Sequence, residues 1–194
     1  MKVGVLGVQG AVNEHMAMVE ASLEGMDVLG TSVLVRKPAQ IADCDALIIP
    51  GGESTVISHH LERSGLGPAI RKRCAKEEFP IMGTCAGMVL LAKRVRGKES
   101  WGLGLMDMEV KRNAFGGQRE SFEADLDIEI FKRSYHAVFI RAPVATRVWG
   151  GCKMLSKLDQ KIVAARQKSC LAFAYHPELT DDTRIHQYFL SLIV

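Results

Sequence analysis

Short, continuous apolar runs alternate with amphipathic segments along the first half of the chain. The apolar runs predict buried strands at residues 2–8, 32–35, 45–49 and 80–84. The amphipathic segments between and after them predict helices at residues 11–23, 54–63, 68–76 and 86–92. This order is typical of a mostly parallel sheet that is covered by helices on both faces.

The middle of the chain has a different pattern, with shorter runs separated by turn residues. Alternation of apolar and polar positions is clearest in residues 122–130, which favours an antiparallel strand with one wet face. Short strands are predicted at residues 105–112, 121–130, 137–141, 147–149, 153–158 and 161–167, followed by a buried strand at 169–175 and a helix at about 181–193. We therefore predict a single α/β domain over residues 1–194. It is a three-layer, flavodoxin-like, mostly parallel open sheet with an added antiparallel portion.

Composition and charge narrow the class of protein. The chain has 194 residues, of which 47% are hydrophobic and 24% charged, and its net charge of +3 comes without a basic run. These values do not indicate a nucleic-acid or anionic-membrane surface. No apolar segment approaches the length of a membrane span. The five cysteines form no CxxC pair, so we expect no disulfide framework or zinc site, and a cytoplasmic location.

Cys85 is a candidate nucleophile. It lies in the stretch Gly83-x-Cys85-x-Gly87, at the predicted junction between a strand and a helix. Small residues on both sides permit the sharp turn that exposes a nucleophile, and the helix N-terminus favours a thiolate. The alternative interpretation is a small buried cysteine in a glycine-rich turn.

Two glycine-rich loops follow predicted strands. Gly4, Gly7 and Gly10 have the spacing G-x-x-G-x-x-G, which is not the dinucleotide fingerprint, although this loop could still line a site at the carboxyl edge of the sheet. The turn Pro50-Gly51-Gly52 could direct backbone N–H groups into a cavity and hold an oxyanion, or it could be a simple tight turn. Ser54 or Thr55 is expected to cap the helix that follows.

His176 is the candidate base for such a nucleophile, because it ends a strand that is predicted to be buried. Pro177 favours an extended backbone at His176, so Glu178, two residues on, can reach and orient the imidazole. His59, His60 and His186 fall on helix patterns and are interpreted as solvated residues. His15 lies on the first helix, and His136 lies in a turn.

Three motifs together resemble the signatures of class I (triad) glutamine amidotransferases: the elbow around Cys85, Pro50-Gly-Gly-Glu-Ser-Thr55, and His176-Pro-Glu178-Leu. Further stretches, among them Arg112-Asn-Ala-Phe-Gly116 and Phe139-Ile-Arg-Ala-Pro143, resemble the glutaminase subunits of pyridoxal 5′-phosphate synthase, the PdxT type. The resemblance extends over essentially the whole chain.

The resemblance implies hydrolysis of L-glutamine, with ammonia passing to a PdxS-type synthase subunit, and it implies no cofactor and no metal. It implies that Cys85 is the nucleophile, His176 the general base and acid, and Glu178 the orienting residue, with oxyanion donors at Gly52 and Ala86. It further implies glutamine contacts at Gly52, Glu53, Ser54, Arg112, Ile140 and Arg141. From the residues alone, either arginine could equally lie on the surface. Two features depart from the family pattern: Gly117, where arginine is usual, and a longer region at residues 25–31.

Three alternatives remain at the level of sequence. The first is the glutaminase of another amidotransferase, which would lack the Arg112-Asn and Phe-Ile-Arg-Ala-Pro stretches. The second is an acyl hydrolase or peptidase with the same elbow, which would not turn over free glutamine. The third is a flavodoxin-like binding module in which the cysteine has no catalytic role. We also expect a glutaminase of this kind to be silent until a partner organises its oxyanion donors.

Overall fold

The computed structural model describes residues 1–97, 102–116 and 120–193. Most of its strands belong to one large sheet, and a second sheet has two strands. The strands are β1 (Lys2–Leu6), β2 (Thr31–Val35), β3 (Ala46–Ile49), β4 (Ile81–Thr84), β5 (Ala92–Val95), β6 (Met106–Lys111), β7 (Ser121–Leu126), β8 (Tyr135–Ile140), β9 (Val144–Val148), β10 (Lys153–Leu158), β11 (Lys161–Gln167) and β12 (Cys170–Phe173).

The helices lie mostly in the first half of the chain and at its end. They are α1 (Val12–Gly25), α2 (Ser54–Arg63), α3 (Leu66–Lys76), α4 (Ala86–Leu91) and α5 (Arg184–Leu190), with short 3₁₀ helices η1 (Pro38–Asp43) and η2 (Pro177–Leu179). None of the helices in the described ranges is long and apolar enough to cross a membrane.

The large sheet has a parallel part and an antiparallel part. Strands β2-β1-β3-β4-β12 lie side by side in that order and pair in parallel, which is the flavodoxin-like order. The sheet continues beyond β12 through the antiparallel neighbours β11, β9 and β6. The predicted fold class is thus confirmed. The order also brings the carboxyl ends of β1, β3, β4 and β12 to one edge, where a site is expected.

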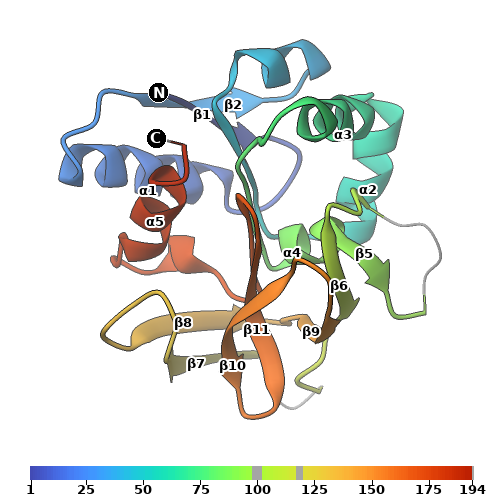
Figure 1. The fold of residues 1–194 in the computed structure, drawn as a ribbon, viewed down its shortest axis with the longest axis vertical. Helices are drawn as coiled ribbons and strands as arrows, with labels where there is room; N and C mark the ends of the chain where they lie inside the picture. Colours follow the sequence, from blue (N-terminus) through green and yellow to red (C-terminus); the bar gives the residue numbers. More distant parts are fainter. Residues whose placement is uncertain (98–101, 117–119, 194) are drawn as a thin grey trace.

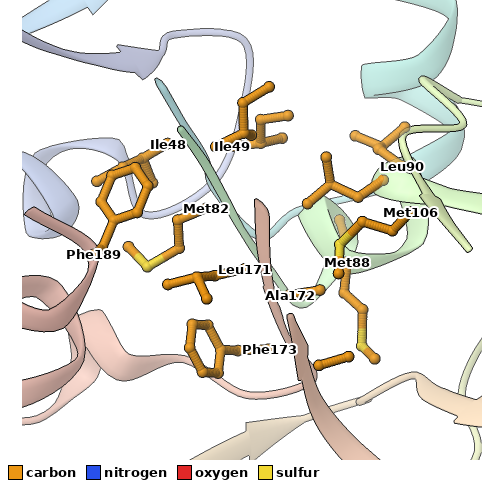
Figure 2. Close-up of a cluster of buried hydrophobic side chains, with 14 of the residues drawn as sticks. Ile48, Ile49, Met82, Met88, Leu90, Met106, Leu171, Ala172, Phe173 and Phe189 are labelled. Atoms are coloured by element: carbon orange, nitrogen blue, oxygen red, sulfur yellow. The ribbon is translucent and has the colours of Figure 1, made fainter. Parts of the chain in front are cut away.

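Helices cover both faces of the parallel part. Figure 1 shows α1 and α5 side by side on one face, and α2, α3 and α4 on the other. The central strands are continuous apolar runs because both of their faces are covered. On β12, Leu171 points toward Phe189 of α5, while Ala172 points to the side of α4 (Figure 2). Both residues are fully buried. A strand that is covered on both faces needs apolar residues at every position.

The two-stranded sheet β7–β8 is hydrogen-bonded to the chain just after the end of β12. The backbone N–H of His176 donates a hydrogen bond of 2.9 Å to the carbonyl of Val138 on β8. Phe122 and Phe139 face each other across the pair with their rings stacked at 4.7 Å. The added antiparallel portion therefore supplies a wall beside the carboxyl edge of the parallel strands.

Several predicted boundaries were wrong in the middle of the chain. The helix after Cys85 ends at Leu91, and β5 (Ala92–Val95), which was not predicted, follows it at once. The predicted strand at residues 147–149 is the end of the longer β9, and the predicted strand at 121–130 ends at Leu126. Pairing with neighbouring strands, which local propensity does not reveal, sets these limits.

Candidate active site

Cys85 lies between the end of β4 and the first residue of α4, with φ 49° and ψ −102°. A side chain seldom adopts positive φ, and such a conformation persists only where the surroundings impose it. The backbones are also close together here, because a Cβ at Gly87 would lie 2.2 Å from the carbonyl oxygen of Ile49 on β3. The turn predicted from the small residues around Cys85 is present.

His176 follows β12, which is the strand next to β4, so its imidazole reaches the Cys85 side chain. Its Nδ1 lies 2.7 Å from Glu178 Oε1, and both side chains are buried. Burial lowers the pKa of His176, but the hydrogen bonds and charges of Cys85 and Glu178 outweigh this effect and raise the pKa to about 10. The geometry therefore favours an imidazolium that is held between the sulfur and a carboxylate.

A cleft of about 380 Å³ opens in front of the sulfur. Most of the residues that the sequence singled out line it, from segments far apart in the chain; these are Gly52, Glu53, Ser54, Cys85, Ala86, Arg112, Ile140, Arg141 and His176. Glu178 lies behind His176. The sequence analysis missed Gln9 and Asn113 in the lining, although the loop that carries Gln9 was recognised as a possible edge of a site.

The Pro50-Gly51-Gly52 turn forms the floor of the cleft beside Cys85. Gly52 has φ 137°, in the region that favours glycine, and the side-chain oxygen of Gln9 accepts a 3.0 Å hydrogen bond from the N–H of Glu53. Ser54 or Thr55 was expected to cap α2, but Glu53 is the cap. Its carboxylate accepts hydrogen bonds from the N–H groups of Thr55 and Val56.

Arg112 lies across the cleft from Cys85 and is bound to residues at the N-terminal end of α2. Its Nη2 lies 2.9 Å from Glu53 Oε1, and its Nη1 donates a 3.2 Å hydrogen bond to Thr55 Oγ1. Burial alone would raise the pKa of Glu53, but the N–H groups it caps, the Thr55 hydroxyl and Arg112 together lower it. The pair places a fixed positive group and a fixed negative group on one wall, which is the pattern needed to recognise an amino acid.

Ala86 and Arg141 complete the cleft from two other elements. Ala86 is the first residue of α4, where a helix leaves its N–H groups without intrahelical acceptors. Arg141 follows β8 with φ 43°, and the carbonyl oxygen of the neighbouring Ile140 lies 3.7 Å from Cys85 Sγ. Within the described ranges, no group of three or more His, Cys, Asp or Glu side chains is arranged to hold a metal ion.

Two histidines behind the site are buried, which the sequence analysis did not predict. His186 was interpreted as a solvated residue, but it is fully buried, because it contacts His15 where α5 packs against α1. His15, which the sequence placed only on the first helix, is also fully buried, and its Nε2 lies 3.2 Å from Glu178 Oε2. No local pattern marks either residue, since the partners are distant in sequence.

The comparison with known proteins settles the family. The model of the SNO glutamine amidotransferase family matches residues 5–194. The chain belongs to this family. It is 50% identical over 193 residues to the pyridoxal 5′-phosphate synthase subunit PdxT of Niallia circulans, and 51% identical over 195 residues to that of Pelotomaculum thermopropionicum. These alignments cover all of this chain and 98% and 96% of the relatives.

A solved structure of a glutamine amidotransferase shares the fold of this family member, with a TM-score of 0.89, 43% sequence identity and 98% coverage of both chains. Of the two departures from the family pattern, Gly117 lies outside the described residues. The region at residues 25–31 connects α1 to β2 through a turn in which Asp27 has φ 54°.

Proposed function

We propose that this chain is the glutaminase subunit of a pyridoxal 5′-phosphate synthase. In this proposal it hydrolyses L-glutamine to L-glutamate and ammonia, and the ammonia passes to a PdxS-type synthase subunit. The observation that carries the proposal is that Cys85 and His176 line one cleft, with Glu178 Oε1 2.7 Å from His176 Nδ1 behind it. The family membership and the names of the relatives support the choice of substrate and pathway.

The first half of the reaction forms a thioester. Cys85 sulfur attacks the side-chain amide carbon of glutamine, while the N–H groups of Gly52 and Ala86 stabilise the oxyanion. His176 then donates its proton to the amide nitrogen, the carbon–nitrogen bond breaks, and ammonia leaves. Glu178 keeps the Nδ1 side of the ring oriented and stabilises the imidazolium before that transfer.

The second half returns the enzyme to its starting state. His176, now neutral, takes a proton from water, and the resulting hydroxide attacks the γ-glutamyl thioester. The carbon–sulfur bond breaks, glutamate leaves, and the thiolate–imidazolium pair is restored. The oxyanion donors act again in this step, and removing one donor in such sites reduces the rate by about 10²–10³-fold.

We assign recognition of the amino-acid end of glutamine to the cleft wall that holds Glu53, Ser54, Arg112, Ile140 and Arg141. An arginine fork binds a carboxylate through two parallel hydrogen bonds. Glu53 offers a carboxylate to the ammonium group. We place the protein in the cytoplasm, since its five cysteines are all free, as expected in a reducing compartment.

Release of glutamate from glutamine, measured with and without a PdxS-type synthase, tests this function. We expect turnover that appears or rises sharply with the synthase, because the partner organises the oxyanion donors. Turnover that the synthase leaves unchanged would place the glutaminase in another pathway.

The Cys85→Ala variant tests the mechanism in the same assay. We expect its turnover to be abolished and its circular dichroism spectrum to be unchanged, because the substitution removes only the sulfur. Glutaminase activity in this variant would rule out the thioester route.

A further inference from the structure

Two fully buried histidines extend the polar chain behind the proposed triad. Helices α1 and α5 lie side by side on one face of the sheet (Figure 1), and they carry His15 and His186, which contact each other. His15 Nδ1 lies 3.1 Å from His186 Nε2. His15 Nε2 lies 3.1 Å from Thr84 Oγ1 and 3.2 Å from Glu178 Oε2. The side chains in contact run, in order, from α5 to the sulfur: His186, His15, Glu178, His176 and Cys85.

Glu178 Oε2, the carboxylate oxygen that His176 does not contact, depends on His15 for a facing donor. Glu178 Oε1 is held by His176, while Oε2 is fully buried and makes no hydrogen bond of good geometry within the described part of the chain. His15 Nε2 lies 3.2 Å from it and also contacts Thr84 Oγ1 at 3.1 Å. A buried carboxylate oxygen without a facing donor is costly.

One set of tautomers fits these contacts. An ionised carboxylate only accepts hydrogen bonds, so donation to Glu178 requires the tautomer of His15 that carries its hydrogen on Nε2. The Nδ1 atom of a neutral His15 is then an acceptor, and His186 must donate to it from Nε2. Burial lowers the pKa of His186 to about 3, while burial and the neighbouring His186 and His176 lower the pKa of His15 well below the ordinary value. Both rings are therefore neutral donors at neutral pH.

Building on the proposed glutaminase function, we propose that His15 is a positioning residue for the triad. It keeps Glu178 in the orientation that meets His176, and His186 fixes the tautomer in which His15 can do so. A neutral donor suits this place because it orients the carboxylate without neutralising the charge that stabilises the imidazolium. A cation here would compete with His176 for the same carboxylate.

The proposal predicts a separation of kinetic effects. Loss of His15 leaves Oε2 facing an apolar side chain, so Glu178 turns away and its bond to His176 weakens. The chemical steps then slow, while the glutamine contacts on the opposite wall stay in place. We expect His15→Leu to lower kcat about tenfold with KM within about twofold, because a buried charged oxygen then loses the N–H that faces it.

The assay uses the full chain with a PdxS-type synthase, and kcat is expressed per folded molecule. His15→Gln places an amide donor near the position of Nε2 and should recover most of kcat. The pKa of His176, followed by NMR of labelled histidine rings, should fall in His15→Leu and return toward the wild-type value in His15→Gln. Val19→Ala, which shortens another fully buried side chain of α1, is the matched control and should change stability but neither kcat nor this pKa.

An unchanged kcat and an unchanged His176 pKa in His15→Leu would overturn the proposal, and so would an equal loss in Val19→Ala. If His15→Leu does not fold, His186→Leu and His186→Gln repeat the test, with a loss of kcat expected only in the leucine variant. Failure of the underlying function would look different, because the wild type would then release no glutamate or Cys85→Ala would remain active.

Discussion

Arg112 lines the cleft, and its guanidinium contacts Glu53 Oε1 and Thr55 Oγ1. The side chains of Arg112 and Glu53 are 32% and 45% exposed, so their ion pair adds little to the stability of the fold. Its value lies in orientation, because a guanidinium that is already fixed loses little entropy when it binds a carboxylate.

Replacing Arg112 by lysine should therefore affect substrate binding more than chemistry. Lysine keeps the positive charge but loses the planar fork. We expect KM for glutamine to rise about tenfold in Arg112→Lys with kcat little changed, which steady-state kinetics will measure. Thr55→Val keeps the guanidinium, removes the hydroxyl that contacts Arg112 and Glu53, and is the matched control. A KM that stays at the wild-type value in Arg112→Lys would remove this residue from glutamine recognition.

At the scale of elements, the turn between β4 and α4 depends on the distance between two backbones. A Cβ at Gly87 would lie 2.2 Å from the carbonyl oxygen of Ile49, and backbone cannot move aside as a side chain can. The first turn of α4 is thus packed directly against β3. This contact holds Cys85 at the tip of the turn and directs its side chain toward the cleft.

Gly87→Ala should destabilise the protein by about 1–3 kcal/mol, the range for overpacking in a rigid interior. Turnover should fall as well, because any shift of α4 moves both the sulfur and the N–H of Ala86. Urea unfolding measures the first effect and glutamate release the second. Gly151→Ala is the control, since a Cβ there meets its nearest neighbour at 3.8 Å. An equal free energy of unfolding for the two variants would contradict this prediction, because β3 and α4 could then move apart without loss of stability.

At the scale of the whole molecule, α1 and α5 come together over the parallel sheet and enclose the pair His15 and His186. Both groups are neutral in the folded protein, because burial lowers both pKa values. In the unfolded chain they titrate near 6.5. Below that pH the unfolded state binds more protons, so stability falls as pH falls from about 6.5 toward 3.

The contribution of His186 to the pH dependence of stability can be measured between pH 7 and pH 5, above the range in which most carboxylates titrate. One such histidine should reduce the free energy of unfolding by about 2 kcal/mol over this interval. His186→Gln removes the titration while retaining a donor, so its stability should fall less steeply with acid than that of the wild type. His59→Gln, at an exposed position, is the control. Parallel curves for His186→Gln and the wild type would contradict a buried neutral His186.

Much of the architecture follows from local sequence. Buried parallel strands need apolar residues on both faces, so β1, β3, β4 and β12 could be predicted as continuous runs. The elbow needs small residues on both sides of Cys85, and a carboxylate two residues beyond His176 falls on the same side of an extended segment. Because these requirements act within a few residues, the order of elements, the elbow and the contact between His176 and Glu178 could all be inferred from the sequence.

Other features depended on contacts between segments far apart in the chain. The strand β5 exists through its pairing with β6, and Glu53 rather than Ser54 or Thr55 caps α2. His15 and His186 are separated by 171 residues, and each alone looks like an ordinary helical histidine. The sequence by itself determined the order of elements in the parallel part of the sheet and the candidate reactive side chains, because those obey local rules. The tertiary structure decided which polar groups are buried against Glu178, because burial is a property of the packed helices and sheet.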